Sequence, residues 1–329
     1  MRALLTAAFL FATPAGAECV GQNLLDAMPA AERASVTAAA NAVPYPTGNF
    51  WTATKGEARL TLVGTYHLDD PRHAMIMSKI GPLIDTVTTV LVEAGPDEET
   101  ALMDRMARDP SVLLLTDTTL IENMSAPEWA LIADAMTDRG IPPFMAAKFQ
   151  PWYVAVMLGI APCQMGQLVD GGGLDKLIIN RATAANVPVR ALEPYDTVFR
   201  IFDAIPIESQ IGMIRSTLAL EARADDYAIT LADAYFEGTT RLIWEIARAE
   251  AARMPGYTQS QIDAEFAIME EALSSSRNRG WIPVIEAAVA EGPTLAAFGA
   301  LHLPGHDGVL ALLDRAGWTL TPLVPAPGP

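Results

Sequence analysis

Histidine is scarce in this chain, and its four copies fall into two short patches. His67 ends the run "LTLVGTYH" and His73 follows shortly after it, while His302 and His306 lie in "LAAFGALHLPGHDG". In both patches an apolar run is followed by Gly, two further residues, His and Leu. Imidazole binds metal ions and carries protons near neutral pH. The repeated G-x-x-H-L pattern therefore predicts that His67 and His302 act in one site.

Two glutamates follow other apolar runs. Glu93 comes directly after "VLV", where a buried charge needs a partner, and Glu193 lies in "ALEP". Glu93 is either functional or part of an internal salt bridge, and Glu193 is either functional or paired with Arg190 or a helix end. Side chains at the carboxyl ends of parallel strands meet along one edge of the sheet. We therefore expect both glutamates to join His67 and His302 there.

Two imidazoles with one or two carboxylates are a typical ligand set for a divalent metal ion, and such sets leave positions open for water and substrate. We expect His67, Glu93 and His302 to be these ligands. A glycine stands three residues before each histidine, at Gly64 and Gly299. It either lets a substrate or another backbone approach closely or forms a tight exit from the strand.

The remaining polar residues of these motifs are expected at the surface. His73 and His306 are predicted to be solvated. Arg277, in "SSSRNRGW", could clamp a carboxylate or stabilise an oxyanion. Its spacing alone favours a solvated arginine on a helix.

The pattern along the chain predicts an α/β fold that brings these side chains together. Five apolar runs indicate strands, at 58–67, 88–95, 187–194, 294–303 and 318–324, and stretches with helical periodicity separate many of them. Such alternation is typical of a mostly parallel sheet with helices on both faces. From about 206 to 291 the chain is rich in Ala, Leu, Ile and Glu without a strand-like run, which predicts a helical lobe. We expect one domain over residues 18–329.

The first 17 residues have the features of a secretory signal. They contain Arg2, an apolar centre and the small-residue cleavage site Ala15-Gly16-Ala17. An uncleaved anchor is less favoured because the run is too short to cross a bilayer, and no later run is long enough to do so. We expect an exported protein, periplasmic or extracellular. The net charge of −17 argues against nucleic acid as a partner.

Cys19 and Cys163 are the only cysteines. In an oxidising compartment they could form one disulfide that ties the N-terminal segment to the body of the protein. Two free thiols are the alternative. Neither cysteine is expected to be a nucleophile.

Taken together, these motifs resemble the TraB/GumN family, which includes the Tiki-like metalloproteases. The main matching segments are "LVGTYH", "VLVEAG", "SRNRGW" and "FGALHLPGHDGVLALLDRAGW", with weaker matches at "QPW", "GGLDK" and "ALEP", over roughly residues 50 to 324. The resemblance implies that His67, Glu93 and His302 are metal-site or catalytic residues. It also implies a manganese- or cobalt-type ion, with zinc as a further option, and peptide-bond hydrolysis. The implied fold is similar to that of erythromycin esterases and haem-binding ChaN-like proteins.

The favoured function is that of an exported, metal-dependent peptidase acting on a peptide or protein. An ion held by His67, Glu93 and His302 would lower the pKa of a bound water to about 7 if it behaved like catalytic zinc. Glu93 or Glu193 would carry the proton, and Arg277 would stabilise the oxyanion. A metal-free, esterase-type hydrolase with one histidine kept basic by Glu93 is the first alternative. A non-catalytic protein that binds a peptide or haem is the second.

Overall fold

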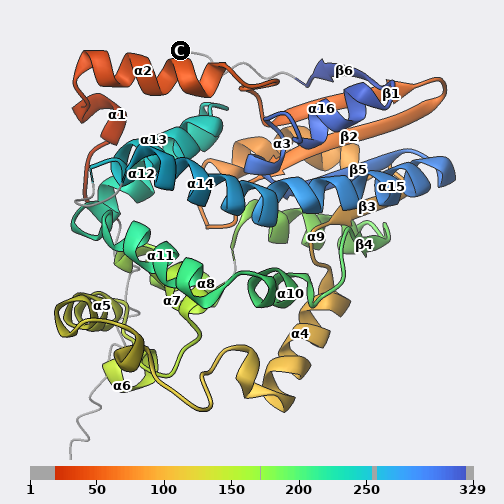
Figure 1. Ribbon diagram of the computed structural model, residues 1–329. Helices are drawn as coiled ribbons and strands as arrows, with labels where there is room; N and C mark the ends of the chain where they lie inside the picture. The colour runs from red at the N-terminus through yellow and green to blue at the C-terminus, as the bar shows by residue number, and fades with distance from the viewer. Residues whose placement is uncertain (1–18, 171, 254–257, 324–329) are drawn as a thin grey trace, which may run out of the picture.

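The computed structural model describes residues 19–170, 172–253 and 258–323, and the predicted signal segment lies outside them. At its centre is a six-stranded sheet in the order β4-β3-β5-β2-β1-β6 (Figure 1). The strands are β1 (Phe50–Lys55), β2 (Ala58–Thr65), β3 (Thr89–Val92), β4 (Val189–Ala191), β5 (Thr294–Gly299) and β6 (Thr319–Pro322). Strands β4, β3, β5 and β2 are parallel, and only β1 runs against its neighbours. The predicted mixed α/β fold with a mostly parallel sheet is confirmed.

The sequence prediction misses β1. This strand forms a hairpin with β2 through a turn at Gly56, whose φ of +61° favours glycine. Trp51 and Ala53 are buried, whereas Phe50, Thr52 and Thr54 are only partly covered. The alternation marks a strand with one covered face, but the run is too short and too polar to stand out beside the neighbouring apolar strand.

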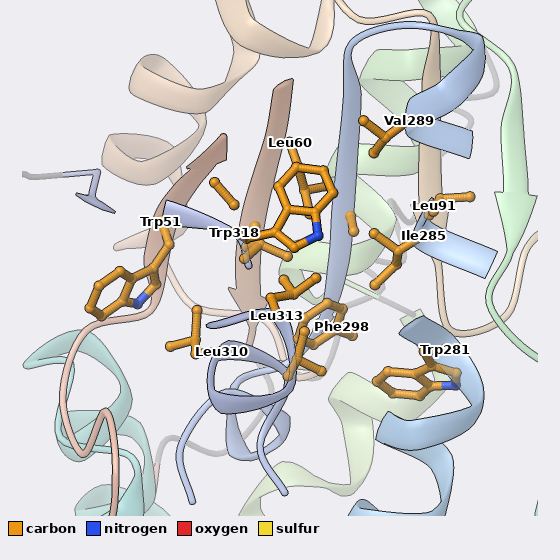
Figure 2. Packing of buried hydrophobic residues seen from close by; sticks show 14 of the residues in the cluster. Trp51, Leu60, Leu91, Trp281, Ile285, Val289, Phe298, Leu310, Leu313 and Trp318 are labelled. Atoms are coloured by element: carbon orange, nitrogen blue, oxygen red, sulfur yellow. The ribbon is translucent and has the colours of Figure 1, made fainter. Parts of the chain in front are cut away.

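Helices cover both faces of the sheet. One face packs against α15 (Ser276–Glu291) and α16 (Val309–Arg315), and three tryptophans join this core (Figure 2). The other face packs against α3 (His73–Ile84), α9 (Leu174–Ala184) and α12 (Ala224–Phe236). Because successive residues of a strand point to opposite faces, the continuous apolar runs supply both cores. Packing on both faces therefore makes the sheet a rigid platform for the residues at its strand ends.

The remaining elements are mainly helical. The other α-helices are α1 (Leu24–Ala27), α2 (Ala30–Asn41), α4 (Pro96–Arg108), α5 (Ala126–Asp138), α6 (Pro143–Ala146), α7 (Pro151–Leu158), α8 (Met165–Asp170), α10 (Thr197–Ala204), α11 (Ile207–Leu218), α13 (Arg241–Ala251) and α14 (Gln259–Glu270). The short helical turns are η1 (Pro110–Val112), η2 (Leu120–Asn123), η3 (Pro162–Gln164), η4 (Glu221–Arg223), η5 (Glu271–Ser275) and η6 (Ala300–His302). Of these, η5 is a π-helical turn that joins α14 to α15.

The described residues between 206 and 291 form helices and turns, and the last of these helices packs against the sheet. The buried residues of α15 include Ile285 and Val289, which pack in the first core. In addition, α11 packs in a third core with helices α5 and α7, which precede residue 206. The helical layer is therefore assembled from several parts of the chain.

A disulfide joins Cys19 to Cys163, residues separated by 144 positions. The predicted pairing is confirmed. It anchors the N-terminal segment at η3, and disulfides are typical of proteins that fold in oxidising compartments. Among the described residues, no helix combines the length and apolar character needed to cross a bilayer.

Candidate functional site

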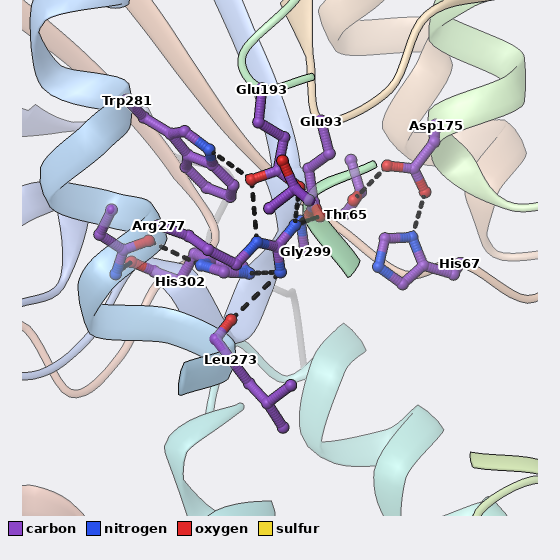
Figure 3. A network of polar contacts seen from close by, with 12 residues as sticks. Thr65, His67, Glu93, Asp175, Glu193, Leu273, Arg277, Trp281, Gly299 and His302 are labelled. Atoms are coloured by element: carbon purple, nitrogen blue, oxygen red, sulfur yellow. Dashed lines mark hydrogen bonds and ion pairs between the residues drawn. The ribbon is translucent and has the colours of Figure 1, made fainter. Parts of the chain in front are cut away.

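The predicted site residues lie together at the carboxyl ends of the parallel strands (Figure 3). Glu93 follows β3 directly, whereas Glu193 and His67 stand two residues beyond β4 and β2. His302 ends the turn η6 after β5, so the strand stops at Gly299, short of the predicted end at 303. Arg277 reaches the same edge from the first turn of α15. Residues far apart in the sequence thus form one polar cluster.

Gly299 marks the point where the two histidines and the first glutamate converge. A Cβ atom added to this glycine would lie 3.1 Å from His67 Nε2, 3.3 Å from Glu93 Oε1 and 3.7 Å from His302 Cδ2. Without a side chain at Gly299, a narrow gap separates these three residues, and an added Cβ atom would crowd His67 Nε2 and Glu93 Oε1.

The matching glycine of the first motif has a different role. A Cβ atom on Gly64 would lie 2.6 Å from Leu303 Cδ1 and 3.0 Å from the Cα and Cβ atoms of Ala300. Close packing between β2 and η6 requires this glycine. The glycine of the shared G-x-x-H pattern thus allows close packing at Gly64, whereas at Gly299 it borders the site.

Arg277 is the hub of the polar cluster, and its side chain is only 13 % exposed. Its Nε donates to Glu193 Oε2 at 3.0 Å, and its Nη2 donates to Glu193 Oε1 and to Glu93 Oε2, both at 2.6 Å. Its Nη1 donates to the carbonyl of Leu273 at 3.1 Å and contacts His302 Nε2 at 3.2 Å. All five N–H groups of the guanidinium thus have acceptors. The expectation of a solvated arginine is wrong, because spacing along a helix does not reveal two carboxylates from other strands.

The two glutamates differ in what they face. Glu193 also accepts from Trp281 Nε1 at 2.9 Å, so it is paired with Arg277 and not with Arg190, whose partner is Glu291. Glu93 Oε1 accepts from the backbone N–H of Gly299 at 2.6 Å. Glu93 Oε1 has a second lone pair, so it can accept one further hydrogen bond.

The charge of Glu93 is stabilised from several sides. Burial alone would raise the pKa of its carboxyl, but His302, Arg277, His67 and the Gly299 N–H lower the pKa to about 2. Glu93 is therefore a carboxylate at neutral pH and a weak base.

His67 is paired with an aspartate that the sequence prediction did not assign to the site. Its Nδ1 lies 2.7 Å from Asp175 Oδ2, and Asp175 Oδ1 accepts from Thr65 Oγ1 at 2.6 Å. The Asp175 carboxylate, through its charge and its hydrogen bond, raises the pKa of His67 to about 9. The His67 side chain is 62 % exposed. It is thus the member of the cluster that is most exposed to solvent.

A glycine-rich turn brings Asp175 to His67. A Cβ atom on Gly173 would lie 2.2 Å from the His67 carbonyl oxygen, and the Leu174 N–H donates to the carbonyl of Tyr66 at 2.9 Å. Only glycine allows this close approach of two backbones. The "GGLDK" segment therefore positions a carboxylate, and this role depends on a contact 108 residues away in the sequence.

His302 has the opposite environment. It is 6 % exposed, its Nδ1 lies 2.6 Å from Asn278 Oδ1, and its ring packs on Trp281. The Asn278 amide nitrogen donates to two carbonyls, so its oxygen must accept the proton on His302 Nδ1. Burial lowers the pKa of His302 to about 4. Its Nε2 is therefore an unprotonated acceptor at neutral pH.

The two remaining histidines do not share one environment. His306 is exposed, as predicted, whereas His73 is 1 % exposed and packs among Tyr66, Tyr235 and Phe236. The prediction of a solvated His73 is wrong because the first turn of α3 faces the second core. Neither ring nitrogen of His73 has a hydrogen-bond partner among the described residues.

The donor types in this cluster suit a divalent ion, but their positions do not. His302 Nε2 and Glu93 Oε2 both face N–H groups of Arg277. Among the residues that the structure describes, His67, Glu93 and His302 do not bring three ligand atoms within 4.8 Å of one another. The three predicted ligands therefore do not fit an ion while Arg277 is in place.

Comparison with known proteins gives one family. The pattern of the TraB/PrgY/gumN family matches residues 49–322, which include the sheet and all of the cluster. A comparison with curated proteins finds no match.

Proposed function

The chain belongs to the TraB/PrgY/gumN family, and from that premise we propose that it is an exported hydrolase of peptide bonds with the His67–Asp175 pair as its base. One observation carries the proposal: His67 Nε2 and Glu93 Oε1 both border the narrow gap beside Gly299. When His67 is neutral, above its pKa of about 9, a water molecule beside these atoms could donate one hydrogen bond to each of them. The Cys19–Cys163 disulfide supports export.

The proposed reaction follows general acid–base catalysis. In its neutral form, His67 removes a proton from the water as the oxygen attacks the peptide carbonyl carbon. The Asp175 carboxylate orients the ring through Nδ1 and stabilises the imidazolium that forms. His67 then returns the proton to the leaving nitrogen as the C–N bond breaks, so the proton balance closes.

In this scheme His302 is a positioning residue for Arg277, and Arg277 both positions Glu93 and donates to the oxyanion. Arg277 keeps Glu93 ionised and fixed, so that Glu93 can orient the water. The contact between Arg277 Nη1 and His302 Nε2 is the longest of the five contacts of the guanidinium, at 3.2 Å. The oxyanion that forms on the peptide carbonyl could therefore take the place of His302 Nε2 as the acceptor for this N–H group, while the other four contacts of Arg277 stay in place.

Two alternatives remain open. Manganese, cobalt or zinc held by His67, Glu93 and His302 would polarise water instead, but Arg277 would first have to leave Glu93 and His302. The other alternative is a protein that binds a peptide or haem without cleaving it. The acid–base scheme would also serve an ester, as in the erythromycin esterases whose fold this chain is predicted to share.

Cleavage of a fluorogenic peptide mixture by purified protein tests the proposal. We expect His67→Asn to lower the rate by at least about 100-fold, the usual effect of losing a general base. His306→Asn is the matched control, because His306 is exposed and lies outside the cluster. Full activity of His67→Asn would refute the assignment, and a wild-type protein that binds peptide without cleaving it would favour the non-catalytic alternative.

A further inference from the structure

A cavity lies next to the Arg277 cluster. It has a volume of about 980 Å³ and is bordered by α10, by the continuous helix α14–η5–α15 and by the segment after β4. Glu193, Arg277 and Trp281 line it and also belong to the cluster. The cavity therefore adjoins the cluster on the side of Glu193 and Arg277.

Most of the cavity wall is apolar. The largest apolar side chains that line it are Leu192, Ile201, Ile205, Ile268, Trp281 and Val284. Ile268 is 46 % exposed, and Val198 and Ile207, each next to a lining residue, are 41 % and 39 % exposed. Exposed apolar side chains gathered around a hollow are typical of a binding surface.

The charged residues of the wall are already paired. Glu193 pairs with Arg277, Arg200 lies 3.4 Å from Asp196, and Glu271 pairs with Arg279. A ligand therefore meets no uncompensated charge in the cavity. This environment favours a neutral, apolar ligand over a charged one, because a buried charge without a partner is costly.

We propose that this cavity binds large aliphatic or aromatic side chains of the peptide next to the bond cleaved beside Gly299. The inference rests on the proposed function, because it takes the ligand to be the substrate. The volume lies at the upper end of the range for small-ligand pockets, so it accommodates a short apolar segment. The enzyme would then select substrates by apolar residues on one side of the cleaved bond.

Gly280 offers a way to fill the cavity without disturbing the fold. It lines the cavity within α15, and an added Cβ atom would meet no atom within 4 Å. Leucine is also a better helix former than glycine, so Gly280→Leu is expected to fold. Gly166→Leu is the matched control, since Gly166 lies in α8, has the same free space and does not line the cavity. Ile268→Glu, at the exposed rim, is a second variant.

The test measures binding by calorimetry, with N-acetyl-Leu-Phe-Leu-amide and N-acetyl-Ser-Asn-Ser-amide as probes. We expect the apolar peptide to bind wild-type protein and Gly166→Leu equally, and to bind Gly280→Leu and Ile268→Glu at least tenfold more weakly. The polar peptide should bind at least tenfold more weakly than the apolar one to wild-type protein. Unchanged affinity in Gly280→Leu, equal affinity for both peptides or no binding by wild-type protein would overturn the inference.

The same proteins separate this inference from the proposed function. Apolar peptide binding that is lost in Gly280→Leu, together with an absence of cleavage, would leave the cavity assignment standing and refute the hydrolase. His67→Asn should bind the apolar peptide like wild-type protein, because His67 does not line the cavity.

Discussion

His67 Nδ1 and Asp175 Oδ2 lie 2.7 Å apart, although α3, β3 and the helices α4 to α8 lie between them along the chain. The pair leaves His67 Nε2 free to face the space beside Gly299. An imidazole bonded to a carboxylate through one nitrogen and open at the other is arranged to exchange protons with a substrate or water.

The first prediction concerns the charge of His67. The Asp175 carboxylate raises the pKa of His67 to about 9, so the ring is protonated below that pH. Asp175→Asn removes the negative charge and is expected to move the pKa of His67 down toward its ordinary value of about 6.5. NMR titration of the four histidines measures this shift, with His67→Asn to assign the signal. An unchanged titration in Asp175→Asn would show that the pair does not control the charge.

The second prediction concerns the space beside Gly299. The Cβ atom of Gly299→Ala would enter that space 3.1 Å from His67 Nε2 and 3.3 Å from Glu93 Oε1. We expect peptide cleavage to fall by at least about tenfold while the fold is retained, because the methyl group displaces the attacking water. Peptide cleavage and thermal unfolding measure the two effects.

Gly166→Ala is the control for that experiment, because an alanine Cβ at this position meets no atom within 4 Å and Gly166 lies outside both the cluster and the cavity. Gly64→Ala should behave differently from both, since its Cβ would overlap Leu303 Cδ1 and so lower stability. Full activity of Gly299→Ala would mean that the reacting water lies elsewhere.

A third prediction tests Arg277 as the hub of the cluster. Arg277→Met leaves Glu93 and Glu193 as largely buried carboxylates without their cation, and breaking such a pair costs about 3 to 5 kcal/mol. Arg277→Lys should also destabilise the protein, because three donors cannot replace five. Urea denaturation measures the free energy of unfolding.

Arg279 supplies the matched control for Arg277. It lies two residues further along α15, is 43 % exposed and pairs with Glu271 and Asp307 at the surface. Arg279→Met should change the free energy of unfolding by less than about 1 kcal/mol. Equal effects of the two substitutions would contradict the hub assignment.

The fourth prediction concerns the Cys19–Cys163 disulfide. Replacing both cysteines with serine is expected to lower the free energy of unfolding by about 2 to 4 kcal/mol, since the bond closes a long loop in the unfolded chain. Reduction of the wild-type protein should give the same loss, which calorimetric melting can measure. Equal stability of the oxidised protein and the double variant would argue against a stabilising bond.

The strand ends could be predicted from the sequence because their signals are local. Continuous apolar runs indicated five of the six strands, and the parallel order of the sheet brought His67, Glu93, Glu193 and His302 to one edge. These residues are far apart in sequence, but parallel neighbouring strands have their carboxyl ends at the same edge of a sheet.

The partners of those residues could not be predicted in the same way. Asp175 and His67 are 108 residues apart in the sequence, and Arg277 and Glu93 are 184 residues apart. Both contacts depend on how loops and helices pack against the edge of the sheet. The burial of His73 likewise depends on which face of α3 meets the core. Spacing within a segment carries no information about these contacts.

The most direct test of the central claim is the pH dependence of peptide cleavage after exhaustive removal of metal ions. The claim predicts that chelated wild-type protein stays active. Its rate should rise with pH with a midpoint near pH 9, where half of His67 is neutral, and level off at higher pH. Asp175→Asn should lower the plateau rate by about 100-fold or more and move the midpoint to lower pH. Activity that disappears on chelation and returns with manganese, cobalt or zinc, or a midpoint that stays in place in Asp175→Asn, would contradict it.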